Sequence, residues 1–145
     1  MDNIPSISKI EYITPDGISQ FDYSPGETID ISSHLTGSFT ELSISGTASL
    51  NGQAKKSDAG VLYEVSCSAR KAGKSAANFQ TLNTLSSRQH IFRLTDANGQ
   101  KYLIGTKENP AKLEFNDVND GEPTGSRGYT FDISWQSITG IIYLA

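Results

Sequence analysis

The sequence has one cysteine, two histidines and one tryptophan in 145 residues, and these scarcities exclude several classes of protein. A single cysteine, Cys67, cannot form a disulfide within the chain and is compatible with a reducing compartment. It lies in an alternating segment, which predicts a small buried residue and not a nucleophile. His34 and His90 have no second histidine or cysteine at metal-ligand spacing, so we expect no metal site there.

Long apolar runs and targeting signals are also missing. No segment approaches the roughly twenty apolar residues of a membrane-spanning helix, so we expect no membrane partner. The segment Met1–Pro5 has neither the basic region nor the apolar core of a signal peptide, which predicts synthesis in the cytoplasm. The net charge of −4 argues against a broadly basic surface, so we expect no sequence-specific nucleic-acid partner.

The chain lacks the motifs of the common catalytic and cofactor sites. There is no Gly-x-Ser-x-Gly elbow, and Gly125–Gly128 is too short for a phosphate loop. Asn116–Glu122 has the carboxylates and amides that calcium prefers, but its glycine falls one position early and the twelfth position is Gly128, not glutamate. We therefore predict that the protein is not an enzyme and has no catalytic residues, no metal and no cofactor.

The composition favours strands, because serine, threonine, asparagine and glycine are abundant along a chain of single-domain length, residues 1–145. Apolar and polar residues alternate in Glu41–Leu50 and Val61–Ala69, which predicts a hairpin with an exposed tip at Asn51–Gly60. Tyr129–Trp135 alternates without error and predicts a core strand.

The clearest turn lies inside His90–Thr106, where Asp96–Gly99 should reverse the chain as a type I turn closed by a left-handed residue. Ahead of it, apolar residues at three-residue spacing predict a helix from about Ser75 to Ser87. Thr81 and its polar neighbours form helices poorly, so this helix should be held by packing Phe79 and two leucines on a sheet.

The remaining segments are shorter. Ser6–Thr14 predicts a strand and Ile18–Tyr23 a second one that pairs back, so residues 1–25 form either an integral hairpin or an extended arm. Lys112–Phe115 and Ile138–Leu144 predict strands, and Asn116–Gly128 an exposed loop. The predicted fold is α+β and mainly antiparallel β, a β-sandwich or barrel-like sheet with one flanking helix at about residues 75–87.

Part of the chain resembles small structural proteins of tailed bacteriophages. The residues that carry the resemblance are the helix Phe79–Leu85, the hairpin Ile91–Thr106, Asn109–Pro110 and the strand Tyr129–Ser134. The proteins concerned are virion components of the tail and neck, including head-to-tail connectors, in which such a domain assembles into rings. The resemblance implies a non-enzymatic structural role in the virion, in contact with copies of itself and with other virion proteins.

Two other functions remain open. A β-sandwich module that binds a small ligand or carbohydrate would place Trp135 and Tyr102 in its site, although alternation puts Trp135 on the apolar face. A secreted adhesive domain is disfavoured by the lack of a signal peptide.

The distribution of charge suggests where an assembly interface would lie. The segments with least core-forming sequence carry opposite charges, with two lysines on the predicted tip and three carboxylates in the late loop. Opposite patches on one subunit allow head-to-tail contacts. The candidate interface residues are Lys55, Lys56, Asp117, Asp120 and Glu122.

Overall fold

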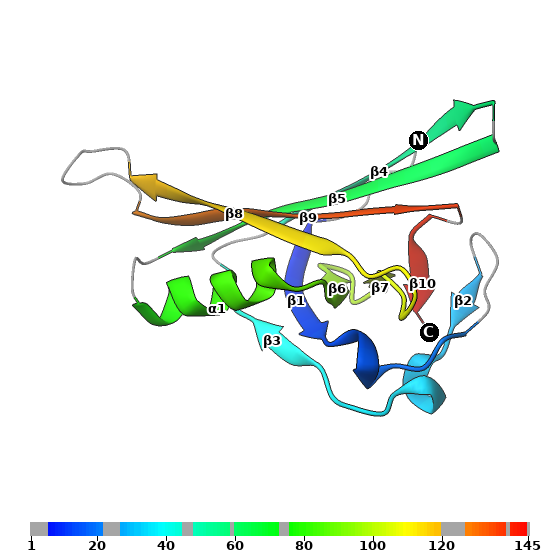
Figure 1. The fold of residues 1–145 in the computed structure, drawn as a ribbon, viewed down its shortest axis with the longest axis horizontal. Coiled ribbons are helices and arrows are strands. Elements are labelled where there is room, and N and C mark those ends of the chain that lie inside the picture. Colours follow the sequence, from blue (N-terminus) through cyan, green and yellow to red (C-terminus); the bar gives the residue numbers. More distant parts are fainter. Residues whose placement is uncertain are drawn as a thin grey trace.

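The computed structural model describes residues 6–21, 27–44, 48–58, 60–72, 76–119, 127–138 and 140–144. These residues form two β-sheets and one α-helix, and within them neither sheet closes into a barrel (Figure 1). All neighbouring strands but one pair are antiparallel. The predicted class, mainly antiparallel β with one helix, is therefore confirmed.

One sheet has six short strands and the other has four long ones. The six-stranded sheet has the order β2 (Thr28–Ile29), β10 (Ile142–Leu144), β7 (Lys101–Ile104), β6 (Ile91–Asp96), β1 (Ile7–Ile13) and β3 (Thr40–Leu42). The four-stranded sheet has the order β4 (Ser49–Ser57), β5 (Gly60–Ala72), β9 (Arg127–Ser137) and β8 (Lys112–Asn119). Two short 3-10 helices, Pro15–Gly17 and Ile31–His34, lie beside β1 and β2 in the sequence.

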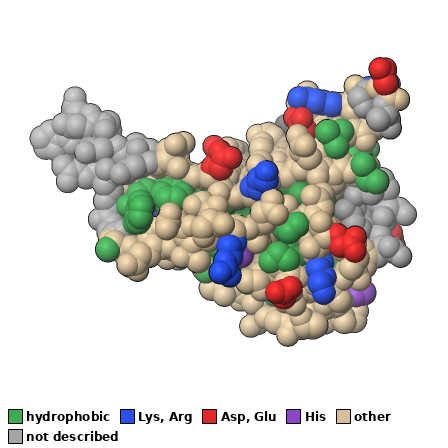
Figure 2. Space-filling view, in the orientation of Figure 1, with side chains coloured by type: hydrophobic (Ala, Val, Ile, Leu, Met, Phe, Trp, Pro, Cys, Tyr) green, Lys and Arg blue, Asp and Glu red, His purple; other side chains and the backbone are tan. Residues whose placement is uncertain are grey.

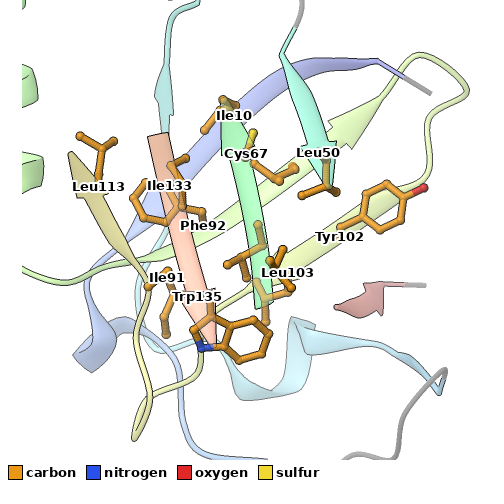
Figure 3. Packing of buried hydrophobic residues seen from close by; sticks show 14 of the residues in the cluster. Ile10, Leu50, Cys67, Ile91, Phe92, Tyr102, Leu103, Leu113, Ile133 and Trp135 are labelled. Atoms are coloured by element: carbon orange, nitrogen blue, oxygen red, sulfur yellow. The ribbon is translucent and has the colours of Figure 1, made fainter. Parts of the chain in front are cut away.

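The hydrophobic core lies between the two sheets. Side chains alternate along the long strands, so every second residue of the four-stranded sheet faces inward. One inward row crosses all four strands through Leu50, Cys67, Ile133 and Leu113, and each of these side chains is buried (Figure 3). The predicted core strand is confirmed as well, because its large apolar residues are all buried: Tyr129, Phe131, Ile133 and Trp135.

The β6–β7 hairpin turns as its sequence predicts. The Asp96 carboxylate accepts hydrogen bonds from the backbone N–H groups of Asn98 (2.9 Å) and Gln100 (3.0 Å). Gly99 has φ +87°, the left-handed conformation that glycine adopts without strain. The Tyr102 hydroxyl donates to the second Asp96 oxygen at 2.8 Å, so this carboxylate anchors both the turn and strand β7.

The helix α1 (Ala76–Ser87) packs differently from the prediction. Leu82 and Leu85 are buried, but Phe79 is 46% exposed and meets the sheet only through the rings of Phe115 and Tyr129. Three residues advance about 300° around a helix, so residues at that spacing drift by about 60° at each step. Phe79 therefore lies at the margin of the buried apolar stripe that Leu82 and Leu85 form along the helix.

Two predicted loops contain strand residues. The chain segment predicted as one strand, Glu41–Leu50, is divided between β3 and β4 in different sheets. The predicted tip Asn51–Gly60 continues β4 to Ser57, which pairs with Gly60. Likewise β8 runs on to Asn119 and β9 begins at Arg127, inside the predicted loop Asn116–Gly128. Strands whose two faces are both polar or exposed have no hydrophobic period, so their sequences resemble loops.

The N-terminal prediction is corrected in part. β1 lies between β6 and β3 and its residues Ile7, Ile10 and Ile13 are buried, so this segment is integral to the fold and is not an arm. In the described part of the predicted strand Ile18–Tyr23, residues 18–21, Ile18 forms an isolated bridge with Leu35 and no longer strand is present. The rest of the predicted arm, residues 1–5 and 22–25, lies outside the described residues. In the predicted strand Ile138–Leu144, the described residues 138 and 140–144 have strand structure at Ile142–Leu144.

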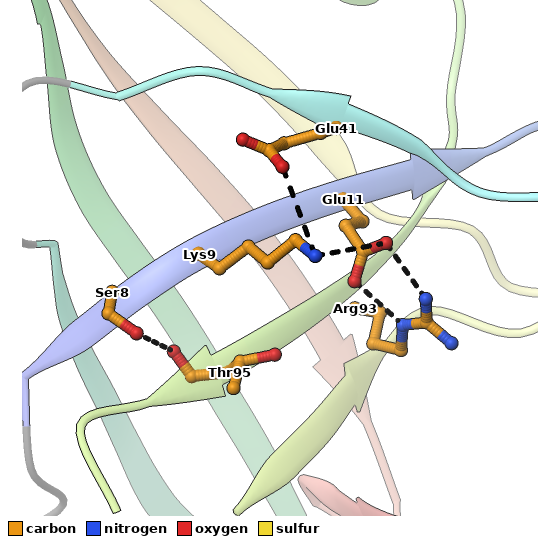
Figure 4. Close-up of polar contacts among 6 residues, drawn as sticks. All are labelled: Ser8, Lys9, Glu11, Glu41, Arg93 and Thr95. Atoms are coloured by element: carbon orange, nitrogen blue, oxygen red, sulfur yellow. Dashed lines mark hydrogen bonds and ion pairs between the residues drawn. The ribbon is translucent and has the colours of Figure 1, made fainter. Parts of the chain in front are cut away.

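An ion pair joins β1 to β6 on the outer face of the six-stranded sheet (Figure 4). The Arg93 guanidinium donates two hydrogen bonds to the Glu11 carboxylate, at 3.0 and 2.8 Å. The ring of Phe39 lies 4.1 Å from the guanidinium carbon and shields the pair. Burial raises the pKa of Glu11, but the bonds and charge of Arg93 outweigh it and hold the pKa below its ordinary value of 4.5.

We predict that Leu82→Ala lowers the free energy of unfolding by about 2 to 5 kcal/mol, because it leaves a cavity in the core. Phe79→Ala should cost clearly less, since almost half of its side chain is already in water. Urea melts of both variants measure the difference. A larger loss for Phe79→Ala than for Leu82→Ala would contradict this packing.

We predict a pH dependence that disappears in Glu11→Gln. The pKa of Glu11 is lower in the folded than in the unfolded protein, so its stabilising contribution is complete above the unfolded value and is lost as pH falls through the folded one. The free energy of unfolding should therefore fall less steeply below pH of about 5 in Glu11→Gln than in the wild type. Equal slopes in urea melts across that range would contradict the prediction.

Candidate functional site

The outer face of the four-stranded sheet is polar and almost balanced in charge. The residues that alternate with the buried ones are mainly serine, threonine, asparagine and glutamine. Three cationic and three anionic side chains lie on this face, and they are Lys55, Arg70, Lys112, Glu64, Asp132 and Glu114. A face of this kind is wet in the isolated chain and offers no large apolar surface of its own.

A broad hollow of about 900 Å³ opens on this outer face. Amide, hydroxyl and carboxylate groups of β4, β5, β8 and β9 line it, together with the segment at Asn109. The Gln136 amide donates to Glu64 at 3.3 Å, and the Asn109 amide donates to the Gln136 carbonyl at 2.8 Å. These groups already bond one another, so the hollow is an ordered polar surface.

Strand β4 is an open edge over most of its length. Ala48 exchanges both backbone hydrogen bonds with Ile7, at 2.8 Å each, on the side away from β5. Successive strand residues direct their N–H and C=O groups to alternate sides, so every second residue after Ala48 also points away from β5. No described strand pairs with that side of β4, where the free groups belong to Leu50, Gly52, Ala54 and Lys56.

Strand β8 is the open edge on the other side of the sheet. Ala111 exchanges both backbone hydrogen bonds with His90, at 3.1 and 2.9 Å, on the side away from β9. By the same alternation, the groups that point away from β9 belong to Leu113, Phe115, Asp117 and Asn119, and no described strand pairs with them. The end of α1 flanks the first part of this edge around a hollow of about 210 Å³ beside Lys112–Glu114, and Leu113 is buried there, so the accessible part of the edge begins at Glu114.

The structure separates the predicted interface residues. Lys55 and Lys56 lie on edge strand β4, where Lys55 forms an ion pair of 2.9 Å with Glu64. Asp117 lies on edge strand β8, at the opposite end of the sheet. Asp120 and Glu122 are outside the described residues. Sequence reasoning did not single out Glu114 and Ala54, which also lie on the two edge strands. Recognising them would have required the full lengths of β4 and β8, which the sequence pattern does not show.

Partly exposed apolar side chains also lie at both ends of the four-stranded sheet. Phe79 and Phe115 form one group, with ring centroids 5.8 Å apart. Val61 is 42% exposed at the far end of the β4–β5 ribbon. In Figure 2 apolar surface is visible near both ends, over α1 and β8 at the left and over the ribbon at the right.

The described residues hold no group of three or more side chains suited to a metal ion. Burial raises the pKa of the Cys67 thiol to about 12, so it is not a nucleophile. Trp135 and Tyr102 are both buried and belong to different sheets, so these two rings do not form one exposed platform, although Trp135 belongs to the lining of the hollow on the outer face. No helix in the described part of the chain is long and apolar enough to cross a membrane.

The chain matches no protein-family model, no curated protein and no solved structure. Any proposal about function therefore rests on the sequence and the geometry of this chain. The feature that stands out is a four-stranded antiparallel sheet that ends in two long, unpaired edge strands.

Proposed function

We propose that the protein is a non-enzymatic structural subunit of a phage tail or neck, which assembles head-to-tail into a ring through the two open edges of its four-stranded sheet. Other virion proteins would dock on the completed ring. The single observation that carries the proposal is the pair of open edges on β4 and β8. The placement in a phage virion comes from the resemblance of the helix, the hairpin and the core strand.

The directions of the strands allow the sheet to continue from one copy to the next. Each of the four strands is antiparallel to its neighbour, so β4 and β8 run in opposite directions. When β8 of one copy meets β4 of the next, the new pair is therefore antiparallel too. The contact joins two different surfaces, and such contacts close into a ring when the rotation between copies allows it.

The lengths of the edges also favour pairing. β4 has nine residues and β8 has eight, whereas strands in globular proteins usually have about five or six. Proteins usually shorten, cover or charge an exposed edge, because its free backbone groups recruit other strands. On β4 the edge is protected mainly by the positive charges of Lys55 and Lys56. A positively charged edge can still pair with a strand that carries negative charge.

A second candidate function is favoured by the polar hollow on the outer face. Its amide, hydroxyl and carboxylate groups could hold the hydroxyls of a carbohydrate or small polar ligand. The aromatic residue in its described lining, Trp135, is only 4% exposed, which weakens this candidate. A compact monomer that binds an oligosaccharide, and loses binding in Gln136→Ala, would favour this function over assembly.

We predict that Ala54→Pro abolishes assembly and leaves the fold intact. The Ala54 N–H points away from β5, so proline removes no hydrogen bond within the chain but blocks pairing with a second copy. The matched control is Ala54→Ser, which keeps the N–H. Sedimentation and negative-stain images over a concentration series at low salt measure assembly, alone and on tail or neck particles that lack this protein.

Wild type and Ala54→Ser should form rings, and Ala54→Pro should remain a folded monomer by circular dichroism. Ala54→Pro assembling as well as Ala54→Ser would remove β4 from the interface. A wild type that stays monomeric under every one of these conditions would overturn the proposed function.

A further inference from the structure

We propose that β8 of one copy pairs with β4 of the next in a single register, in which Glu114 lies directly opposite Lys55. The inference rests on the proposed self-assembly and adds to it which residues meet. The partner surface is thus a second copy of this chain, recognised through one charge pair and one apolar contact.

The alternation of the sheet restricts the possible registers. The core-facing side of β4 carries Leu50, Gly52, Ala54 and the exposed Lys56, and that of β8 carries Leu113 and Phe115. A continuous sheet must keep both sets on the same side, because a shift of one residue would turn every side chain of a strand over. The register can therefore change only in steps of two residues.

The overlap of the two edges selects among these steps. Within one copy, Leu50 and Leu113 lie in the same row across the four strands. If the next copy continued these rows without any shift along the strands, only Ser49–Asn51 would pair with Lys112–Glu114. If the next copy is shifted by six residues along the strand direction, eight residue pairs form. They run from Leu50 opposite Asn119 to Ser57 opposite Lys112. Closed sheets require a stagger of this kind.

The charges favour this register over the two registers that are shifted by two residues in either direction. With eight pairs in place, Lys55 faces Glu114, and both lie on the outer side of the sheet. A shift of two residues one way places Lys55 opposite Lys112, and like charges directly opposite each other are destabilising. The opposite shift places Lys55 opposite Asn116 and shortens the overlap to six pairs, Gly52–Ser57 with Glu114–Asn119.

The proposed charge pair can form without breaking an existing ion pair, whereas pairing at the buried Leu113 requires the end of α1 to move aside. Glu114 is exposed and has no ion-pair partner among the described residues, whereas Lys55 is held on the outer face by Glu64 at 2.9 Å. A lysine ammonium has three N–H donors and can bind both carboxylates. Opposite residues that do not exchange backbone bonds lie closest, and Lys55 and Glu114 would be such a pair, because the free backbone groups belong to their neighbours.

The same register brings apolar groups together on the core side of the sheet. Ala54 of the next copy would lie opposite Phe115, whose ring contacts the half-exposed Phe79. The exposed Val61 of the ribbon lies on this same side of the sheet. Apolar surface that is in water in one copy would thus be covered by the neighbouring copy.

The test is a disulfide between copies in the double variant Gln53→Cys/Asn116→Cys. These two residues are opposite each other in the proposed register, as a close pair with Cα atoms about 4.5 Å apart. Within one copy β5 and β9 separate them, so an intrachain bond cannot form. The native Cys67 is buried and does not compete.

The matched control is Asn51→Cys/Asn116→Cys, which would be opposite in the register shifted by two residues. In the proposed register these two positions are diagonal neighbours, about 7 to 8 Å apart, which is too far for a disulfide without movement of the backbone. We expect a ladder of covalent multimers for Gln53→Cys/Asn116→Cys under mild oxidation. The control should give at least tenfold less product.

Exchanging the charges of Lys55 and Glu114 tests the register independently of the disulfide crosslinks. Glu114→Lys should weaken assembly in sedimentation at low salt, and Lys55→Glu/Glu114→Lys should restore at least part of it. Rings with the stronger crosslink in the control variant, or charge reversal without any effect, would overturn the register and leave the proposed function standing. Rings that form with neither crosslink would overturn edge pairing. A wild type without assembly would overturn both.

Discussion

The backbone groups of the two edge strands impose the constraint on which this structure depends. The inner strands β5 and β9 have strand partners on both sides, whereas alternate residues of β4 and β8 direct their N–H and C=O groups to a side where no described strand pairs with them. In the proposed contact four residue pairs would exchange two hydrogen bonds each, worth about 0.5 to 1.5 kcal/mol per bond, or about 4 to 12 kcal/mol altogether. Association costs roughly 4 to 15 kcal/mol, so one edge contact alone is marginal. Stable assembly would then need the charge pair, the apolar contact and the closure of a ring, in which every copy makes two contacts.

The rest of the fold explains why this sheet can offer its edges. Its inward side is fixed to the second sheet by a continuous apolar core, which holds the four long strands in place. Its outer side is mainly polar and balanced in charge, with Leu62 and the exposed Ile138 as apolar side chains at the hollow. The six-stranded sheet is stabilised by the Asp96 turn and by the Glu11–Arg93 ion pair.

The sequence predicted those parts of the fold that have one wet and one buried face. Tyr129–Trp135, the β6–β7 turn and the burial of Cys67 were recognisable because alternation or turn chemistry marks them. The outer halves of β4 and β8 were mistaken for loops, because residues such as Asn51 and Asn116 are polar where no core faces them. The candidate site was therefore predicted as two charged loops, when it consists of two edge strands that carry some of the same charges. The position of Phe79 was missed for a different reason, since three-residue spacing does not follow the helical period.

Amide hydrogen exchange, resolved by residue, tests edge pairing most directly. In the monomer the N–H groups that point away from β5 should exchange fast, and those bonded to β5 should be protected. Upon assembly, protection should appear at the first set and stay unchanged at the second. The first set comprises Leu50, Gly52, Ala54 and Lys56, and the second comprises Asn51, Gln53 and Lys55. Rings that leave the first set exchanging as fast as in the monomer would contradict the proposal that the sheet continues from copy to copy.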